Sequence, residues 1–153
     1  MADKASPEMI AKVLSLVPQQ FPFRFVDEIV ELTDSKVIGK YRFREDEYFY
    51  KGHFPGWPVT PGVVLVECMA QITVVSLGIY LHLLDGGDMN KLTLFTETNV
   101  DFGAVVLPGQ TVTVYGEKIY FRKGKLKSQA KMVLEDGTVA VEGTLAGMGV
   151  LRS

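Results

Sequence analysis

Residues 50–71 read YKGHFPGWPVTPGVVLVECMAQ, and the rest of the chain is organised around this stretch. It begins as a loop rich in glycine and proline that carries His53, one of two histidines in the chain. It continues without a break into the most apolar helical segment, predicted from Val63 to about Leu84, which carries the lone carboxylate Glu67. A candidate base and a candidate acid therefore flank a rigid turn.

The overall composition predicts one soluble globular domain over residues 1–153. The length is close to that of an ordinary domain, and the apolar fraction of 47% and charged fraction of 22% are typical of such domains. The net charge of −2 gives no electrostatic basis for binding nucleic acid or an anionic membrane, so neither is expected as a partner.

Cysteine content and the N-terminal sequence predict a cytoplasmic location. Cys68 is the single cysteine, which excludes an internal disulfide and a cysteine-based metal cluster, and no secretion signal is visible. The long apolar segment is interrupted by Glu67, Gln71 and His82, which favours a buried helix over a membrane span. No nucleotide-binding, zinc-binding or nucleophile-elbow motif is present, so no metal is expected.

The remaining segments predict an α+β fold, with an antiparallel sheet around one long helix. Ser6 and Pro7 form a typical helix start, and apolar spacing extends this first helix to about Val17. The charged run at residues 44–47 is interpreted as a solvated connection, and Asp-Gly-Gly-Asp at 85–88 as the end of the long helix. Six strands are predicted over residues 23–32, 36–43, 92–98, 111–121, 125–134 and 138–148.

His53 and Glu67 are the residues most suited to proton transfer. Histidine titrates near neutral pH, so His53 is a candidate general base, although a lone histidine is more often structural. Glu67 within an apolar helix would have a raised pKa if it is buried, or it could point out to the domain surface. Gln71 lies one turn further on and could orient Glu67, or be a surface amide.

The other candidate residues have simpler explanations beside the functional ones. Gly62 lies at the start of the long helix, where unpaired N–H groups suit a developing oxyanion or merely begin the helix. Cys68 is interpreted as a packed thiol, and His82 as a surface residue or a partner of the helix dipole. Prolines at three-residue spacing could form a polyproline II ligand, but their apolar neighbours make an exposed ligand the weaker interpretation: Pro55, Pro58 and Pro61.

Residues 52–71 resemble the signature of the FabZ-type β-hydroxyacyl-acyl carrier protein dehydratases. The step from His53 to Glu67, with Pro-Gly pairs at 55–56 and 61–62 between them, matches that family. The similarity extends outward to residues 18–23 and 26–27 on one side, and to Phe102 and residues 106–109 on the other.

The resemblance implies a hotdog fold and a cofactor-free elimination of water from a β-hydroxyacyl thioester on acyl carrier protein. His53 would take the α-proton, Glu67 would protonate the departing hydroxyl, and the Gly62 N–H would bind the thioester carbonyl. The Val59 carbonyl would hold His53. The resemblance also implies a homodimer, with a trimer of dimers as the alternative larger assembly, in which each site takes its histidine and its acid from different subunits.

Two features refine the resemblance. Glu at position 67 and Ala at position 70 are similar to the FabZ type rather than the FabA type, which also isomerises the double bond. Gln19-Gln20 stands where family members often carry His-Arg, and Gly103-Ala104 where they often carry basic residues. The pathway implied by the resemblance is therefore fatty acid synthesis or a related specialised pathway such as polyketide or polyene synthesis. A hotdog thioesterase and a non-catalytic acyl-binding hotdog subunit are the alternative functions.

Overall fold

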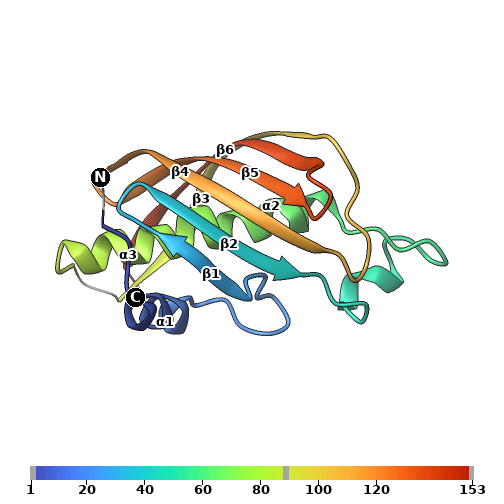
Figure 1. The fold of residues 1–153 in the computed structure, drawn as a ribbon, viewed down its shortest axis with the longest axis horizontal. Coiled ribbons are helices and arrows are strands. Elements are labelled where there is room, and N and C mark those ends of the chain that lie inside the picture. Colours follow the sequence, from blue (N-terminus) through green and yellow to red (C-terminus); the bar gives the residue numbers. More distant parts are fainter. Residues whose placement is uncertain (1–2, 88–89, 152–153) are drawn as a thin grey trace.

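The computed structural model describes residues 3–87 and 90–151, and in it one sheet curves over a central helix (Figure 1). The strands are β1 (Glu28–Leu32), β2 (Lys36–Arg42), β3 (Lys91–Phe102), β4 (Thr111–Arg122), β5 (Lys125–Leu134) and β6 (Val139–Leu151). They pair antiparallel in the order β1-β2-β4-β5-β6-β3. The α+β prediction and the meander of the last three strands are confirmed.

The central helix runs from Gly62 to Leu84 and contains a π-helical segment in its middle. Its parts are α2 (Gly62–Ala70), the π-helix η2 (Gln71–Ser76) and α3 (Leu77–Leu84). By length and by a mean hydropathy of 1.9 it could cross a membrane, but 83% of its most apolar stretch is buried inside the fold. It is the core helix that the sheet covers, which is the hotdog arrangement expected from the resemblance.

Small residues on the sheet let the π-helical segment approach closely. A side chain at Gly116 of β4 would place its Cβ 2.7 Å from Thr73 Cγ2, so only glycine fits there. The Ser128 hydroxyl of β5 donates a buried 2.8 Å hydrogen bond to the Thr73 carbonyl. The sheet therefore supplies a donor to a backbone oxygen of the irregular helix.

The N-terminal helix α1 (Pro7–Leu16) has the start that the sequence predicts, since the Ser6 hydroxyl accepts from the Met9 N–H at 3.1 Å. Strand β1 is shorter than expected and begins at Glu28. The preceding backbone instead bonds to a helix side chain, because Gln71 pairs with Phe23 and Phe25. Conversely, β3 is longer than expected because it pairs with β6 along its length. Asp88, which was expected in the turn that ends the long helix, lies outside the described residues.

Candidate active site

His53 lies in a loop at one end of the molecule, here called the His53 loop (residues 52–61), which follows the 3₁₀ helix η1 (Tyr48–Lys51). Its backbone is held on both sides: the His53 N–H donates to the Phe49 carbonyl at 3.0 Å, and the His53 carbonyl accepts from the Val59 N–H at 2.9 Å. The imidazole Nδ1 lies 2.9 Å from the Val59 carbonyl oxygen.

This last contact sets the tautomer of the ring. A carbonyl oxygen can only accept, so Nδ1 carries the proton and, in the neutral ring, Nε2 keeps its lone pair. The ring also stacks on Phe54, with centroids 4.1 Å apart. His53 is thus a half-buried imidazole whose second nitrogen is available to take a proton.

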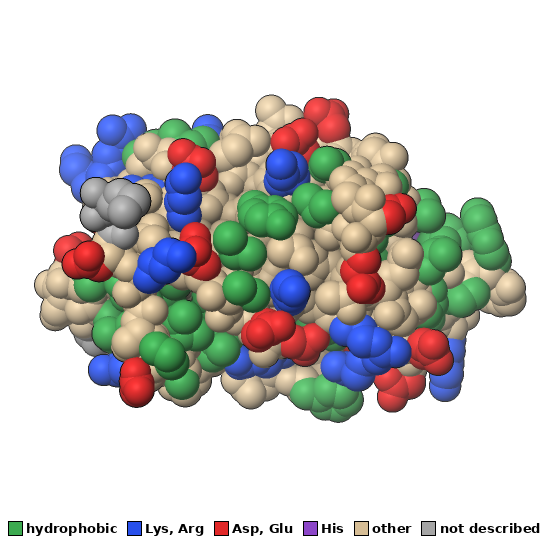
Figure 2. All heavy atoms as spheres, in the orientation of Figure 1, with side chains coloured by type: hydrophobic (Ala, Val, Ile, Leu, Met, Phe, Trp, Pro, Cys, Tyr) green, Lys and Arg blue, Asp and Glu red, His purple; other side chains and the backbone are tan. Residues whose placement is uncertain are grey.

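The tip of the His53 loop exposes large apolar side chains. Phe54 is 46% exposed and Trp57 is 68% exposed. Figure 2 shows hydrophobic side chains gathered at this projecting end of the molecule. Apolar surface of this kind is typical of an interaction surface rather than of a free loop.

Glu67 lies in α2, half-buried, with a carboxylate held by one neighbour. The Gln71 Nε2 group donates to Glu67 Oε2 at 2.9 Å. Burial raises the pKa of the Glu67 carboxyl above its ordinary value, and the hydrogen bond from Gln71 partly offsets that effect. Burial therefore favours the protonated form of this carboxyl relative to an exposed one, which is the form a general acid needs.

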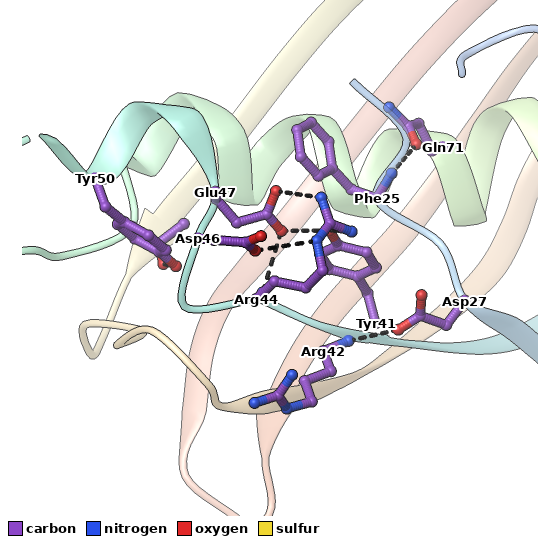
Figure 3. Close-up of polar contacts among 10 residues, drawn as sticks. Phe25, Asp27, Tyr41, Arg42, Arg44, Asp46, Glu47, Tyr50 and Gln71 are labelled. Carbon is purple, nitrogen blue, oxygen red and sulfur yellow. Dashed lines mark hydrogen bonds and ion pairs between the residues drawn. The ribbon is translucent and has the colours of Figure 1, made fainter. Parts of the chain in front are cut away.

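Gln71 is fully buried, so the surface-amide interpretation is wrong. Its Oε1 atom accepts from the Phe25 N–H at 2.7 Å, and its Nε2 group donates to the Phe23 carbonyl at 2.9 Å as well as to Glu67. These bonds fix the orientation of the amide and tie the segment after α1 to the central helix. Figure 3 shows the bond between Phe25 and Gln71.

Gly62 is the first residue of α2, with Pro61 before it. Its N–H precedes the first intrahelical bonds, in which the Pro61 carbonyl accepts from Val64 and Leu65 at 2.9 and 3.1 Å. The Phe102 ring lies against it, since a Cβ at position 62 would be 3.1 Å from Phe102 Cε1. A backbone donor at the positive end of the helix dipole, on a residue without a side chain of its own, suits an oxyanion.

Glu67 borders a small hollow that His53 does not line. The hollow measures about 30 Å³ and is lined by Gln19, Glu67, Ala70, Val74, Val75, Thr93, Phe95 and Gly147. Within the described chain, the two candidate groups are therefore held in separate settings, one on the projecting loop and one beside β3.

Glu47 corrects the prediction of a solvated connection at residues 44–47. Its side chain is completely buried. Its carboxylate is compensated by three hydrogen bonds, which it accepts from the Tyr41 hydroxyl, from the Arg44 N–H at 3.2 Å and from Arg44 Nη2 at 3.0 Å (Figure 3). Burial, and then the bond to Glu47, raise the pKa of Tyr41. Nothing in the charged run itself distinguishes Glu47 from its exposed neighbour Asp46, so sequence reasoning missed this cluster.

The remaining candidate side chains lie away from proton transfer. Cys68 is buried, donates to the Phe25 carbonyl at 3.2 Å and has a pKa raised by burial, so the packed-thiol prediction is confirmed. His82 is half-buried in the last turn of α3 and packs against Phe121, and burial lowers its pKa. Among residues 3–87 and 90–151, no cluster of three or more His, Cys, Asp or Glu side chains could hold a metal ion.

The chain is similar in sequence to known proteins over most of its length. The chain is 37% identical over 139 residues to a protein from Geotalea uraniireducens named 3-hydroxyacyl-[acyl-carrier-protein] dehydratase FabZ, covering 89% of this chain and 92% of that one. It is 34% identical over 146 residues to the protein of the same name from Syntrophobacter fumaroxidans, covering 94% and 96% of the two chains.

Solved structures share the fold at low sequence identity. A chain of the dehydratase heterocomplex ApeI:P from Xenorhabdus doucetiae superposes with a TM-score of 0.76 at 15% identity, over 92% of this chain and 91% of that one. A hypothetical thioesterase from Streptococcus pneumoniae, solved with coenzyme A, gives 0.58 at 13% identity, over 82% and 88%. The family described as FabA-like domain matches residues 17–147, and the chain belongs to that family.

Proposed function

We propose that this protein is a hydro-lyase that dehydrates a β-hydroxyacyl thioester, carried on acyl carrier protein, to the trans-2-enoyl thioester without a cofactor. The observation that carries the proposal is a pair of settings: a His53 ring whose Nδ1 bonds to the Val59 carbonyl, and a Glu67 whose pKa is raised by burial. The names of the FabZ relatives support the same substrate class.

The chemistry needs only groups of this chain. His53 Nε2 takes the proton from the α-carbon, and the Gly62 N–H stabilises the negative charge on the thioester oxygen. The electron pair returns to form the Cα=Cβ double bond as the Cβ–O bond breaks. Glu67 gives its proton to the departing hydroxyl, which leaves as water. Proton exchange with solvent then restores neutral His53 and protonated Glu67.

We further propose that the site is assembled in a homodimer. Strand β3 is an edge of the sheet and exposes Leu94 and Phe95, and the His53 loop exposes Phe54 and Trp57. An unpaired edge strand with apolar side chains is a template for pairing with another chain. A partner placed along β3 would bring its His53 loop toward this chain's Glu67, which explains why one chain holds the two groups apart.

The proposal is tested with purified protein and β-hydroxyacyl-acyl carrier protein, following the ultraviolet absorbance of the enoyl product. The wild-type protein should form enoyl thioester, whereas His53→Ala and Glu67→Gln should each lose about 100- to 10,000-fold in turnover. Release of free thiol in place of enoyl product would indicate a thioesterase, and binding without turnover would indicate an acyl-binding subunit.

Mixing the two inactive variants tests the shared site. A heterodimer of the two variants has one site with both groups intact, so random exchange should restore about a quarter of the wild-type activity. His53→Ala mixed with the double variant His53→Ala/Glu67→Gln is the matched control, because none of its exchanged dimers has a site with both groups intact. No recovery in exchanged dimers would show that each chain supplies both groups to its own site.

A further inference from the structure

The hollow beside Glu67 has the size of a single small polar group. Its volume of about 30 Å³ exceeds what one water molecule needs but leaves no room for a length of acyl chain. Five of its lining residues are apolar or lack a side chain: Ala70, Val74, Val75, Phe95 and Gly147. Its polar lining comes from Glu67, Gln19 and Thr93.

Gln19 lines this hollow and carries an unsatisfied acceptor. Its side-chain Oε1 atom is buried and, among the residues the structure describes, receives no hydrogen bond. A buried polar atom left without a partner costs about 1–3 kcal/mol. Because Gln19 and Glu67 line the same hollow, a residue with such an atom is suited there to a ligand that carries a donor.

The backbone around Gln19 is held in place independently of the hollow. Arg24 donates from Nη1 to the Gln19 carbonyl at 3.4 Å and from Nη2 to the Leu14 carbonyl at 2.9 Å. The neighbouring Gln20 turns away, with its Nε2 group donating to the Val17 carbonyl at 3.1 Å. The two adjacent glutamines thus have different surroundings, and only Gln19 lines the hollow.

We propose that Gln19 Oε1 accepts the hydrogen of the substrate's β-hydroxyl group and, after elimination, a hydrogen of the water that is released. This inference rests on the dehydration proposed above. With its hydrogen donated to Gln19, the hydroxyl oxygen presents a lone pair to the Glu67 carboxyl across the hollow. Glu67 transfers its proton to that lone pair as the Cβ–O bond breaks, and neutral water remains between the two side chains.

This contact strengthens as the reaction proceeds. When the hydroxyl oxygen gains the proton of Glu67, its original O–H group becomes more acidic and a better donor. Gln19 therefore stabilises the transition state more than the bound substrate, so its loss should lower kcat more than it raises KM. A residue that only shapes the wall would instead affect the binding of every acyl thioester alike.

The test compares Gln19→Met, which keeps the length of the side chain without an acceptor oxygen, with Gln20→Met as the matched control. Gln19→Met should lower kcat about 10- to 100-fold, with inhibition by a saturated acyl thioester of the same length unchanged. Gln20→Met should retain wild-type values. Gln19→Glu, which keeps acceptor oxygens, should retain more activity than Gln19→Met at the same pH.

A wild-type kcat in Gln19→Met overturns the inference. It is also overturned if binding of the saturated thioester, measured by inhibition, weakens by the same factor as kcat falls. If circular dichroism shows that Gln19→Met is unfolded, Gln19→Lys takes its place as the variant without an acceptor, and equal rates for Gln19→Lys and Gln19→Glu overturn it. An inactive wild-type protein would refute the proposed function itself, whereas an active wild type with an unaffected Gln19→Met refutes this inference alone.

Discussion

The His53 loop and helix α2 hold their reactive groups in opposite ways. His53 is fixed by backbone atoms, through bonds to Phe49 and Val59, and its loop projects with exposed aromatic side chains. Glu67 is fixed by a side chain, the buried amide of Gln71, within the most apolar element of the chain. The base therefore depends on the path of its loop, and the acid depends on one other residue.

The difference has an energetic side as well. A backbone carbonyl that accepts from His53 remains whatever residue occupies position 59, so this hydrogen bond does not depend on the Val59 side chain. Glu67 instead depends on a single side chain, because the Gln71 amide bonds to Glu67 and to two backbone groups at once. Substitutions near the acid should consequently affect stability and chemistry together, while those supporting the loop should affect mainly the fold.

Among the variants that test this comparison, Gln71→Leu should have the largest effect on the free energy of unfolding. The variant leaves the Phe25 N–H and the Phe23 carbonyl without their partner, which should lower the free energy of unfolding by about 2–4 kcal/mol. It also removes the hydrogen bond that lowers the pKa of Glu67, so that pKa should rise further. Because a general acid must be protonated, the decline of kcat at alkaline pH should move to higher pH.

Urea denaturation and a pH–rate profile measure the two effects, with Gln129→Leu on the exposed face of β5 as the control. A Gln71→Leu protein that is destabilised but has an unchanged pH–rate profile would show that the amide supports the fold without acting on Glu67.

Much of this architecture could be predicted from the sequence, because the signals are local. The cap at Ser6, the alternation in β2 and β5, and the turn at residues 136–137 all act within a few residues, and each appears in the structure. The motif around His53 and Glu67 is equally compact. Gln71 as a partner of Glu67 followed from helical spacing alone, and that hydrogen bond is present.

What escaped prediction depends on contacts between distant segments. The shortening of β1 results from Gln71, which is 46 residues away from the backbone group it binds. Burial of Glu47 depends on Tyr41 projecting from β2 toward it, and the unpaired Gln19 oxygen depends on how the turn after α1 meets β3. Periodicity reports which face of an element is apolar, but not which polar group it meets there.

Glu47→Gln tests the support of the His53 loop and should have an intermediate effect. The carboxylate is fully buried and bonds to both Tyr41 and Arg44, so removing its charge should cost about 1.5–3 kcal/mol in the free energy of unfolding. Asp46→Asn is the matched control within the same charged run. The Asp46 side chain is 86% exposed and 3.5 Å from Arg44, so its loss should cost less than about 1 kcal/mol.

Urea denaturation of both variants gives the comparison directly. Equal losses for Glu47→Gln and Asp46→Asn would mean that the buried cluster adds nothing to the stability of the loop's attachment. A larger loss for Glu47→Gln, with the KM for substrate unchanged, would locate its role in the fold, as expected for the base side of the site.

Glu67→Gln should have the smallest effect on the free energy of unfolding, and at neutral pH it should raise it, whereas the two variants above lower it. Burial raises the folded-state pKa of Glu67 above its ordinary value of 4.5, so the protonated form is favoured in the fold. The contribution of this group to stability is thus fully present below its unfolded-state pKa, and it is lost as the pH rises through the folded-state pKa. At neutral pH the variant should be the more stable protein, by less than about 1 kcal/mol because the carboxylate is partly screened by water.

Thermal unfolding at pH 4 and at pH 7 checks the sign, with Glu135→Gln on the exposed turn after β5 as the control for loss of a surface carboxylate. The gain for Glu67→Gln should be present at pH 7 and shrink at pH 4, where the wild-type carboxyl is itself largely protonated. A variant that is less stable than the wild type at pH 7 would mean that the Glu67 charge stabilises the fold. The acid would then be a structural partner of Gln71, and the contrast between the two sides of the site would not hold.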